Sequence, residues 1–259
     1  MDATPSAPRR HLRRRWILFL ASVVLIVVVG IMWREAGRSD PVPASEAVAD
    51  LRDEGVSATN GGPRPGVYRL AVSGREEGGA GPIRVSRSLP PEGTVSVTGH
   101  GAGWEVLTTY SRQHIEAARY VMRENAVSMV WRRVDVSFAG IGRDDRRDID
   151  GTARLVPSID PAPGTRWNDA YLTGTLKNTV RNSAVRRETL TIGGERVDTV
   201  VVSSVTTTEG ALSGTRDETF WWSPSHRMVI RSRLVIDIGG AFGYRSEIDS
   251  ELAGLTPAT

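Results

Sequence analysis

The sequence predicts a mainly β protein in which a single N-terminal transmembrane helix is followed by an extracytoplasmic antiparallel sheet. Two observations lead to this fold class. Residues 16–33 carry no charge. From residue 67 onward, apolar and polar residues alternate with a period of two, which places the apolar side chains on one face of each strand. An antiparallel sheet can keep one face in water, so we expect a strongly curved sheet, a half-barrel or an open barrel.

The uncharged run at residues 16–33 has the length of a membrane span. At about 1.5 Å per residue, its helix would be roughly 27 Å long, close to the ~30 Å hydrocarbon core of a bilayer. Trp16 and Trp33 stand at its two ends, and tryptophan favours the headgroup level. The alternative is a cleaved signal peptide, whose apolar region is usually shorter and precedes a small-residue cleavage site. We therefore predict an uncleaved anchor.

The charges around the span predict its orientation. Arg13, Arg14 and Arg15 directly precede it, and far fewer basic residues follow it. The positive-inside rule then places residues 1–15, a basic tail, in the cytoplasm and the long C-terminal part outside. The expected location is the cell membrane, crossed once.

Composition narrows the class of protein. The 259-residue chain has a net charge of +3, but its basic excess lies at the N-terminal end. The part expected outside the membrane is slightly acidic, so we expect no nucleic acid as a partner. The chain has no cysteine, which excludes disulfides, a lipid-modified N-terminal cysteine and thiol catalysis. A single lysine among many arginines fits a bacterium with a GC-rich genome.

The segment after the span is predicted to be a flexible linker. Residues 34–65 are rich in Pro, Gly, Ser and Ala and show little apolar periodicity. A short helix over residues 45–53, with Ser45 as its N-cap, is an alternative for part of this segment. The extracytoplasmic all-β domain is then expected over residues 66–254.

Turn signals divide the domain into roughly nine to eleven predicted strands. Gly193 and Gly194 predict a two-residue type I′ hairpin loop. Gly239 and Gly240 predict another reversal of the chain. Residues 223–226, with proline at the second position, predict a turn between two strands.

Three stretches are harder to interpret. Residues 114–124 contain helix formers but also alternate, and we predict a strand because the next two residues then form a turn. Arg132 and Arg133 shift the apolar phase by one position, which predicts a β-bulge there. Residues 142–151 contain Asp-x-Asp-Gly but lack a carboxylate at the first calcium-ligand position, so we expect a solvated loop and no metal.

The sequence contains no recognisable catalytic constellation. His100, His114 and His226, in the expected external part, form no pair at metal-ligand spacing. Residues 210–214 read Gly-Ala-Leu-Ser-Gly, which is not the Gly-x-Ser-x-Gly of a nucleophile elbow. We therefore expect a non-catalytic protein without a cofactor.

Large aromatic side chains are the candidates for ligand binding. The candidates are Trp104, Tyr110, Trp131, Trp167, Phe220 and Trp222. They either fill a packed core, because a single sheet needs bulk to cover it, or line a cavity for an apolar ligand. Trp221 must point to the opposite face of its strand from Phe220 and Trp222.

Three segments of the C-terminal half share a pattern with a known group of folds. They are Gly164-Thr165-Arg166-Trp167, the hairpin around Gly193-Gly194-Glu195, and Thr-Phe-Trp-Trp-Ser-Pro with the strand that follows it, residues 219–230. In these segments the chain resembles the periplasmic lipoprotein-carrier group, whose half-barrels cradle lipid or acyl chains. The resemblance implies a lipid-binding curved sheet over residues 66–252. Those carriers are normally soluble or lipid-linked, so an anchored chain implies tethered binding in place of transfer between membranes.

The expected function is binding of a lipid or another amphiphilic envelope molecule by a membrane-anchored domain. One alternative is a scaffold or accessory protein of the cell envelope that acts through protein contacts. A third is an enzyme acting on envelope polymers. A cavity lined by Trp and Val favours the first, a filled core with an exposed apolar patch the second, and a cleft with His100 or His226 beside a carboxylate the third.

Overall fold

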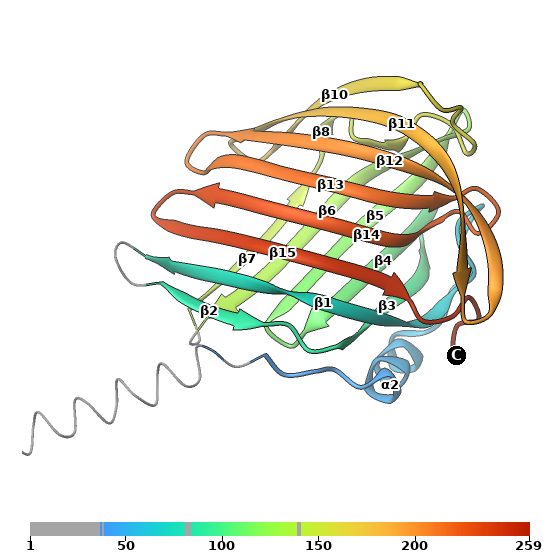
Figure 1. Ribbon diagram of the computed structural model, residues 1–259, viewed down its shortest axis with the longest axis horizontal. Helices are drawn as coiled ribbons and strands as arrows, with labels where there is room; N and C mark the ends of the chain where they lie inside the picture. Colours follow the sequence, from blue (N-terminus) through green and yellow to red (C-terminus); the bar gives the residue numbers. More distant parts are fainter. Residues whose placement is uncertain (1–36, 38, 81–83, 139–140) are drawn as a thin grey trace, which may run out of the picture.

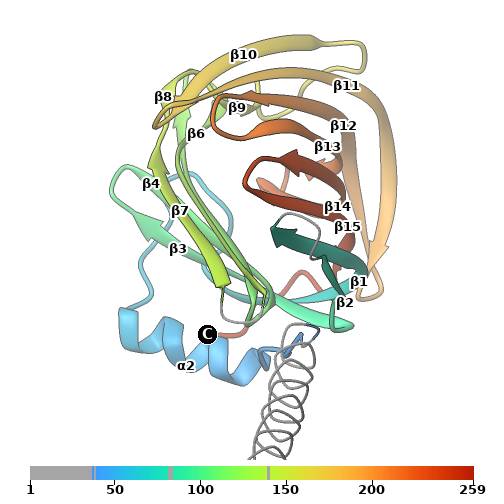
Figure 2. The same ribbon diagram turned by 90° about the vertical axis from the view of Figure 1, so that its left-hand side faces the viewer.

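The structure, a computed structural model, describes residues 37, 39–80, 84–138 and 141–259, which form one antiparallel sheet curled into a nearly closed barrel (Figures 1 and 2). The predicted tail and span, with Arg13, Arg14, Arg15, Trp16 and Trp33, lie outside these ranges. No helix among the described residues combines the length and the apolar character that crossing a bilayer requires.

Fifteen strands make up the described sheet. They are β1 (Gly66–Ala80), β2 (Val85–Ser88), β3 (Glu92–His100), β4 (Gly103–Ser111), β5 (His114–Arg123), β6 (Ala126–Phe138), β7 (Ile141–Asp148), β8 (Asp150–Gly151), β9 (Arg154–Val156), β10 (Arg166–Thr173), β11 (Leu176–Ile192), β12 (Glu195–Glu209), β13 (Ser213–Ser223), β14 (Met228–Gly239) and β15 (Phe242–Leu252). This number exceeds the predicted nine to eleven because short strands were not expected. The solvated loop expected at residues 142–151 is also strand, since most of it forms β7 at one edge of the sheet.

The order of the strands brings the two ends of the sheet close together. Along the sheet the order is β7-β6-β5-β4-β3-β1-β15-β14-β13-β12-β11-β10-β8, and in addition β2 pairs with β1 and β9 with β6. Residues 149–156 connect the two ends: the Met129 N–H in β6 donates to the Ala153 carbonyl (2.8 Å), and the Thr152 N–H donates to the Ala170 carbonyl in β10 (3.1 Å). This short segment therefore nearly closes the barrel.

The alternation of residues along the strands sets what faces the barrel interior. In β10, exposed and buried residues alternate at every position. Trp167, Asp169 and Tyr171 are on the buried side. The Asp169 carboxylate is nonetheless satisfied, because the Arg154 guanidinium lies 2.6 Å away. The enclosed side of this sheet therefore carries charged as well as apolar side chains.

The hairpin of β11 and β12 is longer than its neighbours and completes the apolar core at one end of the barrel. Its outer part holds Leu190, Ile192 and Val197, which are buried in the main core cluster. Gly193 and Gly194 at its tip have φ of 57° and 88°, as a type I′ loop requires, so the predicted hairpin is confirmed. In Figure 1 this hairpin curls over the right-hand end of the sheet.

Two other sequence predictions agree with the structure. Residues 114–123 form strand β5, and Glu124 and Asn125 take positive φ of 49° and 70° in the tight turn to β6. The turn between β13 and β14 closes where proline predicts it, with the Arg227 N–H donating to the Ser223 carbonyl at 2.7 Å.

The predicted bulge in β6 exists, but it lies earlier in the strand than Arg132 and Arg133. Arg119 pairs with Trp131 and the next residue, Tyr120, pairs with Met129, so Val130 is the extra residue. The sequence prediction missed this position because it followed apolar residues only, whereas Arg132 faces the interior. Trp131 consequently points outward, where the Arg119 guanidinium lies 4.3 Å from its ring centroid.

The segment expected to be a flexible linker packs against the barrel over much of its described length. Helix α2 (Ala44–Glu54) contacts β1 and β3 and buries Ala47 and Leu51 against Val67. These two residues are four apart and therefore share one face of the helix. At the other end of the chain, Ala258 forms an isolated bridge to Val67, beyond the predicted domain boundary at residue 254.

Candidate functional site

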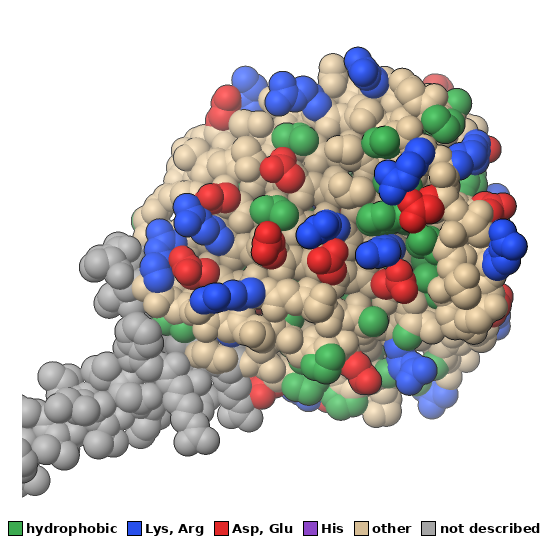
Figure 3. Space-filling view, in the orientation of Figure 1, with side chains coloured by type: hydrophobic (Ala, Val, Ile, Leu, Met, Phe, Trp, Pro, Cys, Tyr) green, Lys and Arg blue, Asp and Glu red, His purple; other side chains and the backbone are tan. Residues whose placement is uncertain are grey.

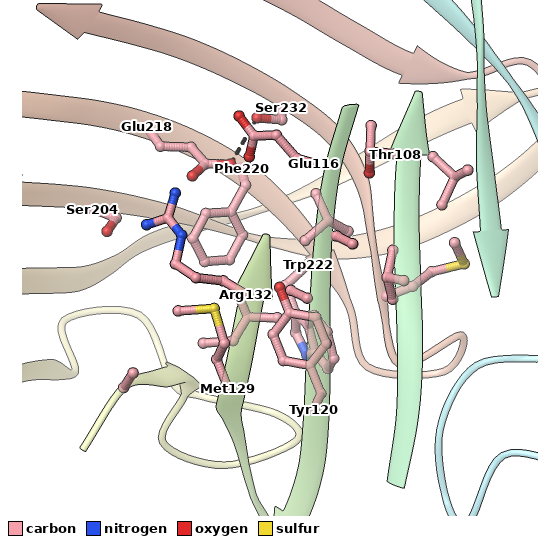
Figure 4. A pocket seen from close by; sticks show the side chains of 18 of the residues that line it. Thr108, Glu116, Tyr120, Met129, Arg132, Ser204, Glu218, Phe220, Trp222 and Ser232 are labelled. Carbon is pink, nitrogen blue, oxygen red and sulfur yellow. Dashed lines mark hydrogen bonds between the residues drawn. The ribbon is translucent and has the colours of Figure 1, made fainter. Parts of the chain in front are cut away.

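The barrel encloses a cavity of about 240 Å³ between β4–β6 on one side and β10–β15 on the other. Its aromatic wall is formed by Trp104, Tyr120, Phe220 and Trp222. The Trp104 and Tyr120 rings stack with their centroids 6.1 Å apart. Figure 4 shows Tyr120, Phe220 and Trp222 grouped around this space.

The structure brings four of the six predicted aromatic residues to this cavity. Trp104, Tyr110, Phe220 and Trp222 line it. Trp222 is also fully buried, and its Nε1–H donates to the Ile159 carbonyl at 2.7 Å. Because the indole N–H is hydrogen-bonded, the Trp222 ring is held in one orientation as part of the cavity wall.

The other two aromatic candidates lie elsewhere. Trp131 points outward because of the bulge at Val130. Trp167 is buried in the core, and its Nε1–H donates to the Arg154 carbonyl at 3.2 Å. Trp221 faces away from Phe220 and Trp222, as predicted, and the Arg231 guanidinium lies 4.9 Å from its ring centroid.

Further along the strands that carry Tyr120 and Phe220 lies a pair of carboxylates joined by one arginine. Arg216 of β13 reaches Glu116 of β5 at 3.0 Å and Glu218 at 3.4 Å. The Ser232 hydroxyl donates to Glu218 at 2.9 Å. Burial alone would raise the pKa of Glu116, but the Arg216 guanidinium and His114 outweigh it and hold that pKa well below its usual range. The cluster therefore keeps its charges in the interior.

A second cavity of about 130 Å³ lies beyond this cluster. Glu116, Arg132 and Arg216 line both cavities. The second cavity is otherwise mainly aliphatic, with Val136 and Ile236 among its lining residues. The charged side chains thus divide the barrel interior into an aromatic chamber and an aliphatic chamber.

A second charged group closes the interior between β1, β2 and β5. Glu76 and Arg87 are fully buried and 2.7 Å apart. The Nδ1 atom of His114, also fully buried, contacts Glu76, and its Nε2 atom lies 3.4 Å from Glu116. The Tyr244 hydroxyl donates to Glu76 at 2.7 Å. Each charge in this group has a partner, as buried charges require.

The pKa values of this group follow from its contacts. Burial would raise the pKa of Glu76, but the His114 imidazolium and the Arg87 guanidinium outweigh it and lower the pKa to about 2. Burial would lower the pKa of His114, but the Glu76 and Glu116 carboxylates raise it to about 9. At neutral pH this histidine is therefore a cation.

These two pKa values predict a plateau of stability between about pH 4.5 and pH 6.5. The Glu76 contribution is complete above the ordinary value of 4.5 and is lost as pH falls toward about 2. The His114 contribution is complete below the ordinary value of 6.5 and is lost as pH rises through about 9. Thermal melts across this range should show Tm falling on both sides. His114→Gln should remove the alkaline decline and leave the acid one, whereas an unchanged Tm from pH 6.5 to 9 would contradict the expected pairing.

The sequence analysis missed the charged side chains of the interior. It singled out none of Glu116, Arg132 and Arg216 for binding, because charged residues on a strand usually face water. One signal was available, because Arg216 and Glu218 have the same strand parity as Phe220 and Trp222. Charged residues that lie on the same face of a strand as large aromatic residues indicate that this face has a polar section inside the barrel.

The two histidines named for a catalytic cleft, His100 and His226, form no ion pair with a carboxylate of the described residues. Within them, no group of three or more His, Asp or Glu side chains could hold a metal ion. His226 lies in the β13–β14 turn, where its Nδ1 atom is 3.0 Å from the Ser223 hydroxyl, a contact between residues three apart in one turn. His100 is exposed. The arrangement in the cavity suits binding, because it combines apolar rings with fixed charges.

Comparison with known proteins adds one loose structural similarity. No protein-family model matches the chain, and no curated protein sequence matches it. The crystal structure of the hypothetical lipoprotein YmcC from Escherichia coli K12 is similar over 82% of this chain and 98% of that chain, with 14% sequence identity and a TM-score of 0.32. At this TM-score the overlap is loose.

Proposed function

We propose that this barrel binds a small amphiphilic molecule of the bacterial envelope, without catalysis, as the extracytoplasmic part of a membrane-anchored protein. The observation that carries the proposal is the cavity of about 240 Å³, which is lined by aromatic rings and, further along the same strands, by charged side chains. Trp104, Phe220 and Trp222 suit the apolar part of such a ligand. Arg132, beside the cluster of Arg216 with Glu116 and Glu218, suits its polar part.

The size of the cavity limits the ligand. Sites for drug-sized ligands usually measure about 300–1,000 Å³, and this cavity lies below that range. A single short chain fits better than a lipid with two long acyl chains. The aliphatic chamber of about 130 Å³ extends the space only if the charged cluster rearranges.

The outer surface gives less support to the alternative of a scaffold. Figure 3 shows basic and acidic side chains interspersed over the face formed by β14 and β15. Arg231 lies 3.7 Å from Glu251, and Arg245 lies 3.1 Å from Asp237. The exposed large apolar residues of the described chain, Val56, Leu172, Val185 and Val235, come from different elements. A protein-docking surface would usually gather such residues into one patch.

Native mass spectrometry of the full chain, purified in lipid nanodiscs, tests the proposal. Wild-type protein should carry a bound small amphiphile, or take up octan-1-ol or octanoate when these are added. Ala118→Leu should abolish this binding at little cost in stability, because Ala118 lines the cavity and the added carbons enter empty space. Ala71→Leu, on the exposed face of β1, is the matched control and should bind normally. Wild-type protein that holds no ligand and takes up no octyl probe would leave the scaffold alternative in its place.

A further inference from the structure

One arginine of the cavity makes no hydrogen bond or ion pair with the described residues. Arg132 of β6 lines both chambers. Figure 4 shows its side chain reaching from β6 toward Ser204 and Phe220. Within the described ranges, no hydrogen bond or ion pair joins the Arg132 guanidinium to another residue. This guanidinium therefore has free donors inside a cavity.

The neighbouring cations are already occupied. Arg216 is held between Glu116 and Glu218. Arg87 and His114 are held by Glu76, and His114 also lies beside Glu116. Three further arginines that line the cavity have ion pairs of their own: Arg133 with Asp135, Arg154 with Asp169, and Arg231 with Glu251. The charge of Arg132 helps to lower the pKa of Glu116, but the two side chains form no ion pair. An arginine that is only partly exposed and makes no ion pair is unusual, because removing a charge from water is costly without one.

The guanidinium group of Arg132 determines which chemical groups of a ligand it can bind. A guanidinium offers parallel N–H donors that fit the two oxygens of a carboxylate, and such charge-assisted pairs are stronger than neutral hydrogen bonds. Glu116 and Glu218, which line the same cavity, would repel a doubly charged phosphate more strongly than a singly charged carboxylate.

We propose that Arg132 binds the carboxylate of an anionic amphiphile whose apolar chain lies along Trp104, Tyr120, Phe220 and Trp222. This inference rests on the proposed function and adds the chemical class of the ligand, a short-chain carboxylate. Arg216 does not receive the ligand; it keeps Glu116 and Glu218 in place beside it. The ligand carboxylate supplies the ion pair that the described residues do not.

Calorimetric titration of the full chain in nanodiscs, with empty nanodiscs as the reference, tests this assignment. The probes share one chain length: octanoate, octan-1-ol, octylammonium and octyl phosphate. Wild-type protein should bind octanoate most tightly and octylammonium most weakly. Arg132→Gln should weaken octanoate binding by about 10- to 100-fold, the range expected for hydrogen bonds to a charged group. It should change octan-1-ol binding little.

Three controls separate this role from a structural one. Arg132→Gln should change Tm little, because the guanidinium makes no hydrogen bond or ion pair with the described residues. Arg132→Lys should bind octanoate more tightly than Arg132→Gln but more weakly than wild-type protein, since lysine keeps the charge but lacks the two parallel N–H donors of a guanidinium. Arg233→Gln, on the exposed face of β14, removes the same charge and should leave binding unchanged.

The outcomes separate two hypotheses: that Arg132 binds a carboxylate, and that the barrel binds an amphiphile at all. If octan-1-ol binds wild-type protein as tightly as octanoate does, or if Arg132→Gln leaves octanoate binding unchanged, the anion assignment is wrong and the proposed function stands. Tighter binding of octyl phosphate than of octanoate would overturn the choice of carboxylate. If no octyl probe binds, both proposals fall.

Discussion

Replacing Trp222 with alanine should lower the free energy of unfolding by about 3–5 kcal/mol, the usual cost of truncating a buried aromatic side chain. The Trp222 ring is only 1% exposed, and its Nε1–H donates to the Ile159 carbonyl. Truncation therefore removes packing and leaves that carbonyl without its donor. Urea unfolding followed by circular dichroism measures the change. Ligand binding should be lost as well, because the same ring lines the cavity.

Two further variants isolate the cause. Trp222→Phe keeps a ring but loses the donor, so it should cost about 1–2 kcal/mol. Trp131→Ala removes an indole of the outer face that contacts the Arg119 guanidinium, and should cost no more than about 1 kcal/mol. A cost for Trp222→Ala below about 1.5 kcal/mol would mean that the ring is loosely packed and serves only the cavity.

Replacing Arg216 with methionine should destabilise the protein by a similar amount, about 3–5 kcal/mol, because it leaves two interior carboxylates without their shared cation. The Arg216 side chain is 20% exposed and the Glu116 side chain 16%. Water therefore screens this cluster much less than it screens a surface pair. The measurement is again urea unfolding, at pH 6 so that His114 stays charged in both variants.

The control for Arg216 lies on the outer surface. Arg245 pairs with Asp237, but their side chains are 65% and 56% exposed, so Arg245→Met should change the free energy of unfolding little. Adding Glu218→Gln to Arg216→Met should recover part of the loss, because one of the two carboxylates is then neutral. Equal costs for Arg216→Met and Arg245→Met would show that the interior is as well hydrated as the surface.

Much of the local structure could be predicted from the sequence, because it depends on neighbouring residues. The two-residue period of strands needs no knowledge of the fold. Gly193 and Gly194 take positive φ, which glycine permits at no steric cost. The strand over residues 114–123 followed from the turn at Glu124 and Asn125. Helix α2 was predicted only as an alternative to a flexible linker. Its few apolar residues pack against Val67, and this contact with a distant strand cannot be inferred from the local sequence.

By itself, then, the sequence determined the strand class, the main turns and the opposite directions of Trp221 and Trp222. Only the tertiary structure decided which face is enclosed, because that depends on pairings between distant strands, such as β1 with β15, and on the closing segment 149–156. A charged residue at a given strand parity looks the same in a sequence whether that face meets water or a cavity. An unpaired charge on a face that meets bulk water costs little free energy. The curled sheet encloses the face that carries Arg132 and Arg216, and an enclosed charge needs a partner. Arg216 finds its partners in the protein, and Arg132 therefore became the candidate for binding.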